Sequence, residues 1–275
     1  MLPFWLLTYE EMLAMLIDRS GSNAPNRAML YSKTVFKEKL KYLDEITDTT
    51  LKSNITIDSP VSYMISNVLK ELKEQDEGIQ PGAKSGTVKL GTFNRKLTRI
   101  IQRLEAKSQD KRLGFLFQIS NDELQLNWMN DFCNRLMHGT MLSPQKAVVK
   151  VIDFSKIPSD VLPLIIGIVA RILFTVQQWT IKANRLPISF LCDEDHLYIP
   201  ERTNQDAASE LDLKSFGRIA KKGRKYGVSL TVISQRPSEV NKTVLSQCNN
   251  FIALRLSNAE DQAEIKKLLP DNLSG

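Results

Sequence analysis

Short apolar runs alternate with helical patterns through the second half of the chain. The run Val228–Ile233 is rich in β-branched residues, and residues 188–192 form an equally short apolar run, which is typical of buried strands. A long apolar pattern at about 160–183 and a basic one at about 215–226 predict helices between the strands. Such repetition of strand, helix and strand predicts an α/β fold with a largely parallel sheet. The other two predicted strands are Ala147–Phe154 and Asn250–Leu256.

The first half of the chain is mainly helical in pattern. A short strand or turn at residues 2–7 leads into a helix from about Tyr9 to Ile17, and SGSNAPN at residues 20–26 ends that pattern. Apolar residues then recur at helical spacing in three further segments. These helices are predicted around Val35–Ile46, from Ser59-Pro60 (N-cap and first residue) to Leu72, and at Asn94–Ala106.

The change of pattern predicts where the parts of the chain begin and end. Residues 1–26 are expected to begin the α/β core, and residues 140–275 to form most of it. Residues 27–139 are expected to form a mainly helical insertion in the core, or a lid on it. Along the last predicted helix of this insertion, Arg95, Arg99 and Arg103 recur every four residues. They could follow a phosphate backbone, although an ordinary solvated helix face fits the same spacing.

Acidic and amide side chains lie at the ends of two predicted strands. Asp193, Glu194 and Asp195 follow the strand at 188–192, and Gln235 follows Val228–Ile233. The carboxyl ends of parallel strands are where α/β proteins bind ligands. An Asp there suits Mg²⁺, and a Glu beside it can orient or deprotonate a water molecule. Taken alone, the acids could equally cap a core strand in a solvated loop.

Three spaced motifs carry a resemblance to a known family. LCDEDH, GRIAKKGRKYGVSLTVISQRPSEVNKTVLSQC and NNFIALRLSNAEDQ occur in this order within residues 147–275. Together they resemble the HerA branch of the HerA/FtsK hexameric ATPases, and Leu2–Asn26 resembles the family more weakly. The resemblance implies a RecA-like P-loop NTPase core that uses ATP and Mg²⁺, with Walker B, sensor and arginine-finger motifs.

The family pattern assigns roles to four residues of this chain. It implies that Asp193 holds the metal and contacts the cofactor, and that Glu194 activates the attacking water. It implies that Gln235 senses the γ-phosphate, and that Arg224 of GRKYG reaches into the site of a neighbouring subunit in trans. Arg218 is the second candidate for this trans arginine. The same basic helix could instead contact DNA, or be a solvated face.

A phosphate-binding loop is missing from the sequence. The segment Gly78–Gly91 (GIQPGAKSGTVKLG) contains Lys84-Ser85, but it lacks the GxxxxGK[ST] spacing and no strand precedes it. We expect a flexible surface linker there. In HerA-like proteins the phosphate loop lies upstream of the part that this chain resembles. The sequence is therefore expected to be a piece of a longer protein, inactive by itself, although a naturally short gene product is the alternative.

Composition adds limits on location and partners. The formal charge of +6 and the three widely spaced cysteines fit a reduced, cytoplasmic protein that could contact nucleic acid. Two histidines without a CxxC pair make a zinc site improbable. The apolar start lacks a basic signal-peptide region, and the apolar stretch 162–174 is too short to span a membrane and contains Arg171. No membrane segment is expected.

Two functions follow from these observations. The first is a ring, by resemblance a hexamer, that hydrolyses ATP to translocate or unwind double-stranded DNA. Such a ring would work with an effector, such as a nuclease or a sirtuin-type NAD-consuming protein, in DNA processing or antiphage defence. The alternative is an oligomeric scaffold that assembles and regulates an effector enzyme, with ATP hydrolysis secondary or absent.

Overall fold

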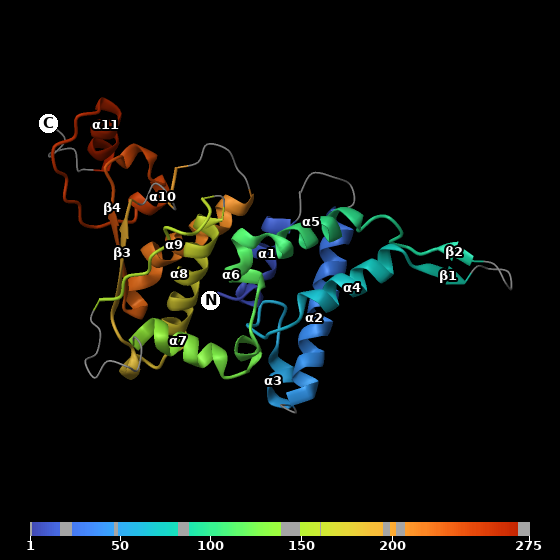
Figure 1. Ribbon diagram of the computed structural model, residues 1–275. Helices are drawn as coiled ribbons and strands as arrows, with labels where there is room; N and C mark the ends of the chain where they lie inside the picture. Colours follow the sequence, from blue (N-terminus) through green and yellow to red (C-terminus); the bar gives the residue numbers. More distant parts are fainter. Residues whose placement is uncertain are drawn as a thin grey trace. The chain divides into compact units, whose positions relative to one another are not determined.

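A computed structural model of the chain describes residues 2–16, 24–46, 49–81, 88–138, 149–159, 161–194, 199–201 and 207–268. The chain divides into two compact units, Met1–Phe132 and Cys133–Gly275 (Figure 1). Each unit is described by itself below. Parts of several predicted features, namely Ser20–Asn23, Lys84-Ser85, Ala147-Val148, Asp195 and His196, lie outside the described residues.

The first unit is built almost entirely from helices, as its periodic apolar pattern predicts. α2 is the longest of them, with 23 residues, and it packs against α4, which in turn packs against α5. Short 3-10 turns connect the smaller helices. The elements are η1 (Phe4–Leu6), α1 (Tyr9–Leu16), α2 (Ala24–Ile46), α3 (Thr49–Asn54), α4 (Ile65–Asp76), α5 (Thr98–Gln109), η2 (Lys111–Leu113), α6 (Gly114–Phe117), η3 (Asn121–Leu124) and α7 (Trp128–His138), whose last residues belong to the second unit.

The predicted apolar face of α5 is confirmed. Leu97, Ile100, Ile101 and Leu104 are all buried, with at most 5% of their surface exposed. Residues three and four apart lie on one face of a helix, so burying this stripe holds α5 against α4. The arginine stripe is only partly helical, because Arg95 precedes α5 and has a left-handed backbone with φ of 53°. The prediction of one continuous basic helix face is therefore wrong at its first residue.

The helix predicted to start at Ser59-Pro60 starts later, at Ile65. The hydroxyl of Ser59 accepts a hydrogen bond from the backbone N–H of Thr56 at 2.9 Å. Its carbonyl accepts one from the ammonium of Lys39 at 2.7 Å. Ser59 therefore closes a turn and ties it to α2 instead of capping a helix. The prediction was wrong because Ser is as suitable for turns as for N-caps.

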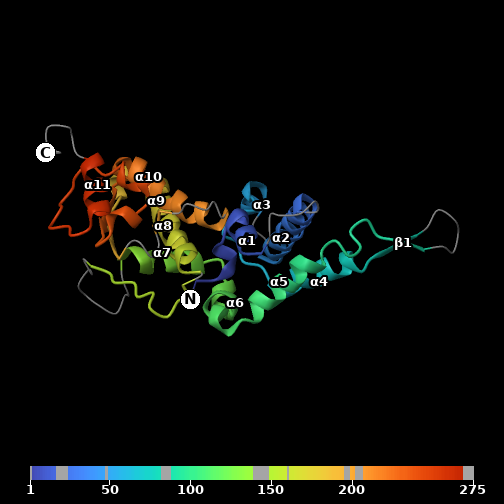
Figure 2. The same ribbon diagram turned by 90° about the horizontal axis from the view of Figure 1, so that it is seen from above.

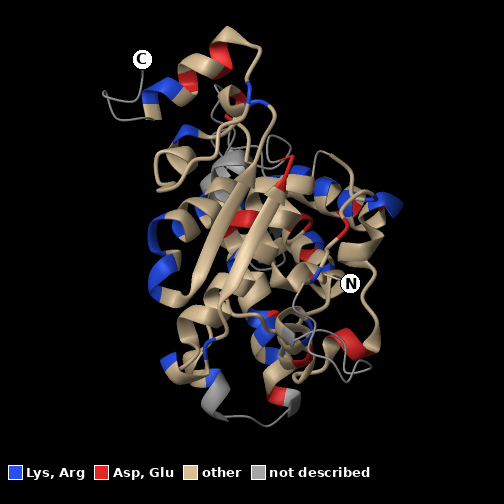
Figure 3. Ribbon diagram, turned by 90° about the vertical axis from the view of Figure 1, so that its left-hand side faces the viewer, with Lys and Arg blue, Asp and Glu red and all other residues tan. Residues whose placement is uncertain are grey.

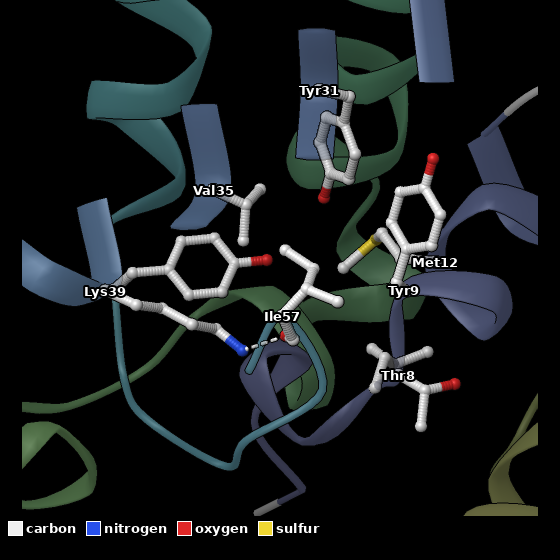
Figure 4. A pocket seen from close by; sticks show the side chains of 9 residues that line it. Thr8, Tyr9, Met12, Tyr31, Val35, Lys39 and Ile57 are labelled. Atoms are coloured by element: carbon white, nitrogen blue, oxygen red, sulfur yellow. Dashed lines mark hydrogen bonds between the residues drawn. The ribbon is translucent and has the colours of Figure 1, made fainter. Parts of the chain in front are cut away.

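A small pocket in the first unit contains the most buried cation of the described chain (Figure 4). Lys39 of α2 is 1% exposed, and its Nζ also donates to the carbonyl of Ile57 at 2.6 Å. Burial lowers the pKa of Lys39 from its ordinary value to about 8, although Asp58 opposes the shift. The ammonium lies 5.6 Å from the centre of the Tyr63 ring, a cation–π contact. Lys39 thus joins α2 to the turn that precedes α4.

The described ends of the expected linker between Gly78 and Gly91 form the two strands of a β-hairpin, so the prediction is wrong there. β1 (Ile79–Pro81) pairs antiparallel with β2 (Val88–Leu90), with Ile79 opposite Leu90. The hairpin extends away from the end of α4 (Figures 1 and 2). The sequence did not reveal the strands because a linker and a hairpin both contain turn-forming residues. The strands are also too short, with too few apolar residues, to show a period-2 pattern.

The second unit has a mixed helix and strand structure. β3 and β4 form a two-stranded parallel sheet in which Ile188 lies opposite Val228 and Asp193 opposite Ile233. α8 packs against α9, and α9 packs against β4. The two strands lie side by side (Figure 3). The elements are α8 (Leu162–Trp179), η4 (Lys182–Asn184), β3 (Ile188–Asp193), α9 (Ala207–Tyr226), β4 (Val228–Ile233), η6 (Pro237–Glu239), α10 (Lys242–Leu245) and α11 (Ala259–Leu268).

One face of the strand pair forms the core of this unit. Alternate residues point to opposite faces of a strand, and Phe190, Cys192 and Val232 face the cluster made with α8 and α9. The other face is open, and Leu191 on it is 67% exposed. The sequence correctly predicts β3, but it predicts a buried strand, whereas one face of β3 is exposed. The buried cluster comprises Ile166, Ala170, Phe174, Cys192, Ile199, Phe216, Ile219, Val228 and Val244.

Two predicted strands are not formed in the described residues. Residues 149–154 and 250–256 have no regular secondary structure, and their apolar side chains are exposed, with Val151 at 86% and Ile252 at 94%. A strand exists only when a neighbour supplies its hydrogen bonds. The apolar pattern of both segments shows β propensity, but no described strand pairs with either of them. Both strand predictions are corrected on this ground.

Of the two main helices, α9 is longer than predicted, whereas α8 is shorter and ends at Trp179 instead of about residue 183. α9 begins at Ala207, eight residues before the start predicted at about Ser215. Among the described residues, only α8 is long and apolar enough to cross a membrane, and 61% of it is buried within the structure. α8 therefore packs as a core helix of the second unit.

Candidate functional site

The structure brings together the polar residues that follow β3 and β4. Because the strands are parallel and in register through Asp193 and Ile233, their carboxyl ends meet at one edge. Glu194 follows β3 directly and Gln235 follows β4 by two residues. The side-chain amide Nε2 of Gln235 donates a hydrogen bond to Oε1 of Glu194 at 2.9 Å. Two residues that are 41 positions apart in sequence thus form one site.

Glu194 has a left-handed backbone conformation, with φ of 53°. For a residue with a side chain this conformation costs roughly 1 kcal/mol, and such strain concentrates at functional sites. The backbone N–H of Glu194 donates to Oδ1 of Asp193 at 3.1 Å. The left-handed turn ends the strand, so the Glu194 carboxylate lies at the edge of the sheet next to Gln235.

Asp193 is suited to hold a cation. It is the last residue of β3, and its side chain is exposed. Mg²⁺ is a hard ion that accepts one or two carboxylates together with phosphate oxygens and water. An accessible carboxylate at a strand end, with a second carboxylate next to it in sequence, fits this donor set. Within the described residues there is no group of three or more His, Cys, Asp or Glu that could hold a metal without such outside ligands.

Local contacts fix the turn that carries Gln235. The backbone N–H of Arg236 donates to Oγ of Ser234 at 3.2 Å. The guanidinium of Arg236 forms an ion pair with Glu239 at 2.7 Å, and this partner raises the pKa of Arg236. Pro237 is buried. Ser and Pro restrict the backbone on both sides of Gln235, so the amide is presented by a defined turn.

A second connection ties the two loops of the site together, and the sequence alone did not reveal it. The segment 199–201 returns after β3 and pairs with residues 239–241 through a bridge between Pro200 and Val240. The backbone N–H of Asn241 donates to the carbonyl of Ile199 at 2.9 Å, and that of Lys242 donates to the Glu201 carboxylate at 2.9 Å. The apolar residues Ile199 and Val240, both buried, were the available signal.

Arg224 lies at the other end of the strand pair from Glu194. It is exposed in the last turn of α9, and its carbonyl accepts the N–H of Gly227 just before β4 begins. A six-residue strand separates this end from the site by roughly 17 Å. That separation exceeds the reach of an arginine side chain, so the structure does not bring Arg224 to the site of its own chain. Arg218 is also exposed on α9, six residues earlier.

The fold and these residues together define a class of protein. The carboxylates and the amide lie at the carboxyl edge of a parallel strand pair, and helices pack on one face of that pair. This arrangement is that of an α/β NTPase.

Comparison with known proteins refines this class. The chain is 29% identical to the DNA double-strand break repair helicase HerA of Sulfolobus acidocaldarius over 222 residues, which are 77% of the chain and 42% of that relative. It is 25% identical to HerA of Sulfurisphaera tokodaii over 273 residues, covering 89% of the chain and 51% of the relative. Over 96 residues it is 40% identical to HerA of Pyrococcus furiosus, covering 32% and 16%.

These similarities confirm the resemblance to the HerA-type ATPases that the motifs predicted. The chain spans about half or less of the length of these relatives. No protein-family model matches the chain.

Proposed function

We propose that this chain supplies half of the nucleotide-hydrolysis site of a HerA-type ATPase that moves or unwinds double-stranded DNA. The observation that supports this most directly is the contact between Gln235 and Glu194 at the ends of two adjacent parallel strands. The HerA relatives are named as DNA double-strand break repair helicases. The strand pair, its flanking helices and these relatives favour a RecA-like core for the second unit.

Each site residue has a separate task in this proposal. Asp193 holds Mg²⁺, directly or through water, and the metal would neutralise charge on the ATP phosphates. Glu194 orients and deprotonates the attacking water. Gln235 contacts both that water and the γ-phosphate, and its hydrogen bond to Glu194 couples the nucleotide state to the position of the base. Arg224 acts on the site of a neighbouring subunit, since it cannot reach its own.

The first test is ATP hydrolysis by this chain and by a form extended upstream through a phosphate-binding loop, each with and without duplex DNA. We expect turnover only in the extended form, and an increase when DNA is present. In that form Glu194→Gln should reduce kcat at least about a hundredfold, because a positioned general base contributes that much or more. The variant should still bind ATP. Unchanged turnover in Glu194→Gln would show that Glu194 is not the base.

The wider assembly is also part of the proposal. A ring of subunits, a hexamer by resemblance, would use the exposed basic side chains of α9 for the trans arginine or for DNA. A nuclease or a sirtuin-type NAD-consuming protein would dock on the ring as its effector, in DNA processing or antiphage defence in the cytoplasm.

The second candidate function is a scaffold that assembles and regulates an effector enzyme. The residues of this sequence contain no GxxxxGK[ST] motif, and a scaffold does not require one. The contact between Glu194 and Gln235 favours the ATPase instead, since a scaffold has no need of an acid and an amide held together at a strand edge. Effector assembly without ATP turnover in the extended form would support the scaffold. Turnover that rises with DNA would support the motor.

A further inference from the structure

A buried carboxylate in α11 holds the turn that follows Gln235. Asp261 is 4% exposed, and its Oδ1 accepts two hydrogen bonds from Ser238. One comes from the backbone N–H at 3.0 Å and the other from the hydroxyl at 2.6 Å. Ser238 lies in η6, three residues after Gln235. The contact spans 23 positions of sequence and joins α11 to the candidate site.

The burial and charge of Asp261 make this contact stronger than an ordinary surface hydrogen bond. A buried carboxylate is stabilised only when its oxygens are hydrogen-bonded, and bonds to an ionised acceptor are stronger than neutral ones. Hydrogen bonds from Ser238 lower the pKa of Asp261, with a smaller contribution from Asn258. Asn258 accepts the N–H of Glu260 at 3.1 Å and caps the start of α11. Asp261 is therefore ionised near neutral pH, and its hydrogen bonds with Ser238 fix its position against the turn.

The turn between β4 and η6 is consequently held at both ends. β4 fixes the chain up to Ile233 through its pairing with β3, and Asp261 fixes Ser238. The Gln235 side chain between these anchors is exposed. Its position against Glu194 therefore depends on the backbone of the turn and on little side-chain packing.

We propose that Asp261 is a positioning residue that holds the Ser238 turn so that Gln235 meets Glu194 and the γ-phosphate. This inference rests on the proposed ATPase function and adds α11 to its machinery. Asp261 does not touch the nucleotide. It acts through Ser238, so a movement of α11 would change the geometry of the site.

A purely structural role for Asp261 makes different predictions. If Asp261 only anchored α11, its loss would lower the stability of the protein and would affect the binding of an ATP analogue and of ADP equally. A positioning role affects the γ-phosphate contact specifically, because Gln235 meets that group and not the rest of the nucleotide. The comparison of an ATP analogue with ADP separates the two roles.

The test compares Asp261→Ala with Glu260→Ala in the extended form. Glu260 is an exposed acid in the same turn of α11, so its removal changes charge equally and leaves Ser238 bound. We expect Asp261→Ala to lower kcat about tenfold or more, and to weaken binding of a non-hydrolysable ATP analogue while ADP binding is unchanged. Glu260→Ala should match the wild type. Equal loss of analogue and ADP binding, or unchanged kcat, would overturn the positioning role.

A second measurement does not depend on turnover. In the present chain, Asp261→Ala should speed hydrogen exchange of the Ser238 amide and shift the side-chain NH₂ resonances of Gln235 in NMR spectra, while Glu260→Ala should change neither. Unchanged Gln235 resonances would refute the inference even if the protein proved to be no ATPase. Conversely, absence of turnover in the wild-type extended form, with these shifts present, would refute the proposed function and leave Asp261 as the anchor of this turn.

Discussion

Lys39 shows how one side chain couples protonation to folding in the first unit. Its pKa is about 8 in the folded protein, below its ordinary value of 10.5. Between these two pH values the unfolded chain binds more protons than the folded chain, so stability increases as pH rises through this range. The tyrosines in the same pocket act in the opposite sense. Burial raises the pKa of Tyr31 and Tyr63, so stability falls above about pH 10, where the unfolded tyrosines ionise.

We therefore predict a stability maximum between pH 9 and 10 for the first unit, with a gain of about 1–2 kcal/mol over pH 7.5. Urea unfolding can be followed by the fluorescence of Trp5 and Trp128 after Trp179→Phe, since Trp179 is 82% exposed. Lys39→Met should remove most of the rise between pH 8 and 9.5. The control Lys33→Met, at an exposed position of α2, should keep it. An equal rise in Lys39→Met would assign the effect to other groups.

The junction between α9 and β4 depends on one glycine. A Cβ atom at Gly223 would lie 2.3 Å from the carbonyl oxygen of Val228, much closer than atoms can approach. Gly217 in the same helix has open space at that position. The close approach of α9 to the start of β4 brings the helix onto the sheet and sets the direction of the strand that leads to Gln235.

The same substitution at the two glycines should therefore have opposite effects. Gly223→Ala is expected to lower the free energy of unfolding by about 1–3 kcal/mol, the usual cost of forced overpacking. Gly217→Ala is expected to be neutral or to raise it by up to about 1 kcal/mol, because alanine favours helix over glycine. Denaturant unfolding of both variants checks this. Similar effects at both positions would mean that helix propensity, and not the contact with Val228, decides the outcome.

The elements that the sequence predicted well are those whose pattern is decided within the element. In α5 the apolar residues recur with the period of a helix, and in β3 a short apolar run ends in polar residues. Residues 149–154 and 250–256 have strand-like patterns too, yet strand formation also needs a neighbouring strand, which a local pattern does not specify. The contact between Glu194 and Gln235 was predictable from strand ends in a parallel sheet. The contact of Asp261 with Ser238 was not, since no periodicity relates an acid in a helix to a distant turn.

At the scale of the whole molecule, the positions of Arg224 and Glu194 at opposite ends of one strand pair constrain how the site can be completed. A single subunit cannot bring the two together, whereas a head-to-tail ring can place the arginine of one subunit at the site of the next. A ring of this kind has a testable property. Every active site is shared, so two different defects can compensate for each other when they lie in different subunits.

We predict such compensation for Glu194→Gln and Arg224→Ala in the extended form. Each variant alone should be inactive, because every interface then lacks either the base or the arginine. In an equal mixture that exchanges subunits, about a quarter of the interfaces combine an intact Glu194 with an intact Arg224, and activity should return to about that fraction. The control is an equal mixture of wild type with the double variant. A shared site gives the same quarter there, whereas a site contained in one subunit gives about half in the control and none in the mixture of single variants. The ratio of these two activities therefore decides whether Arg224 acts between subunits, and it does so independently of the number of subunits in the ring.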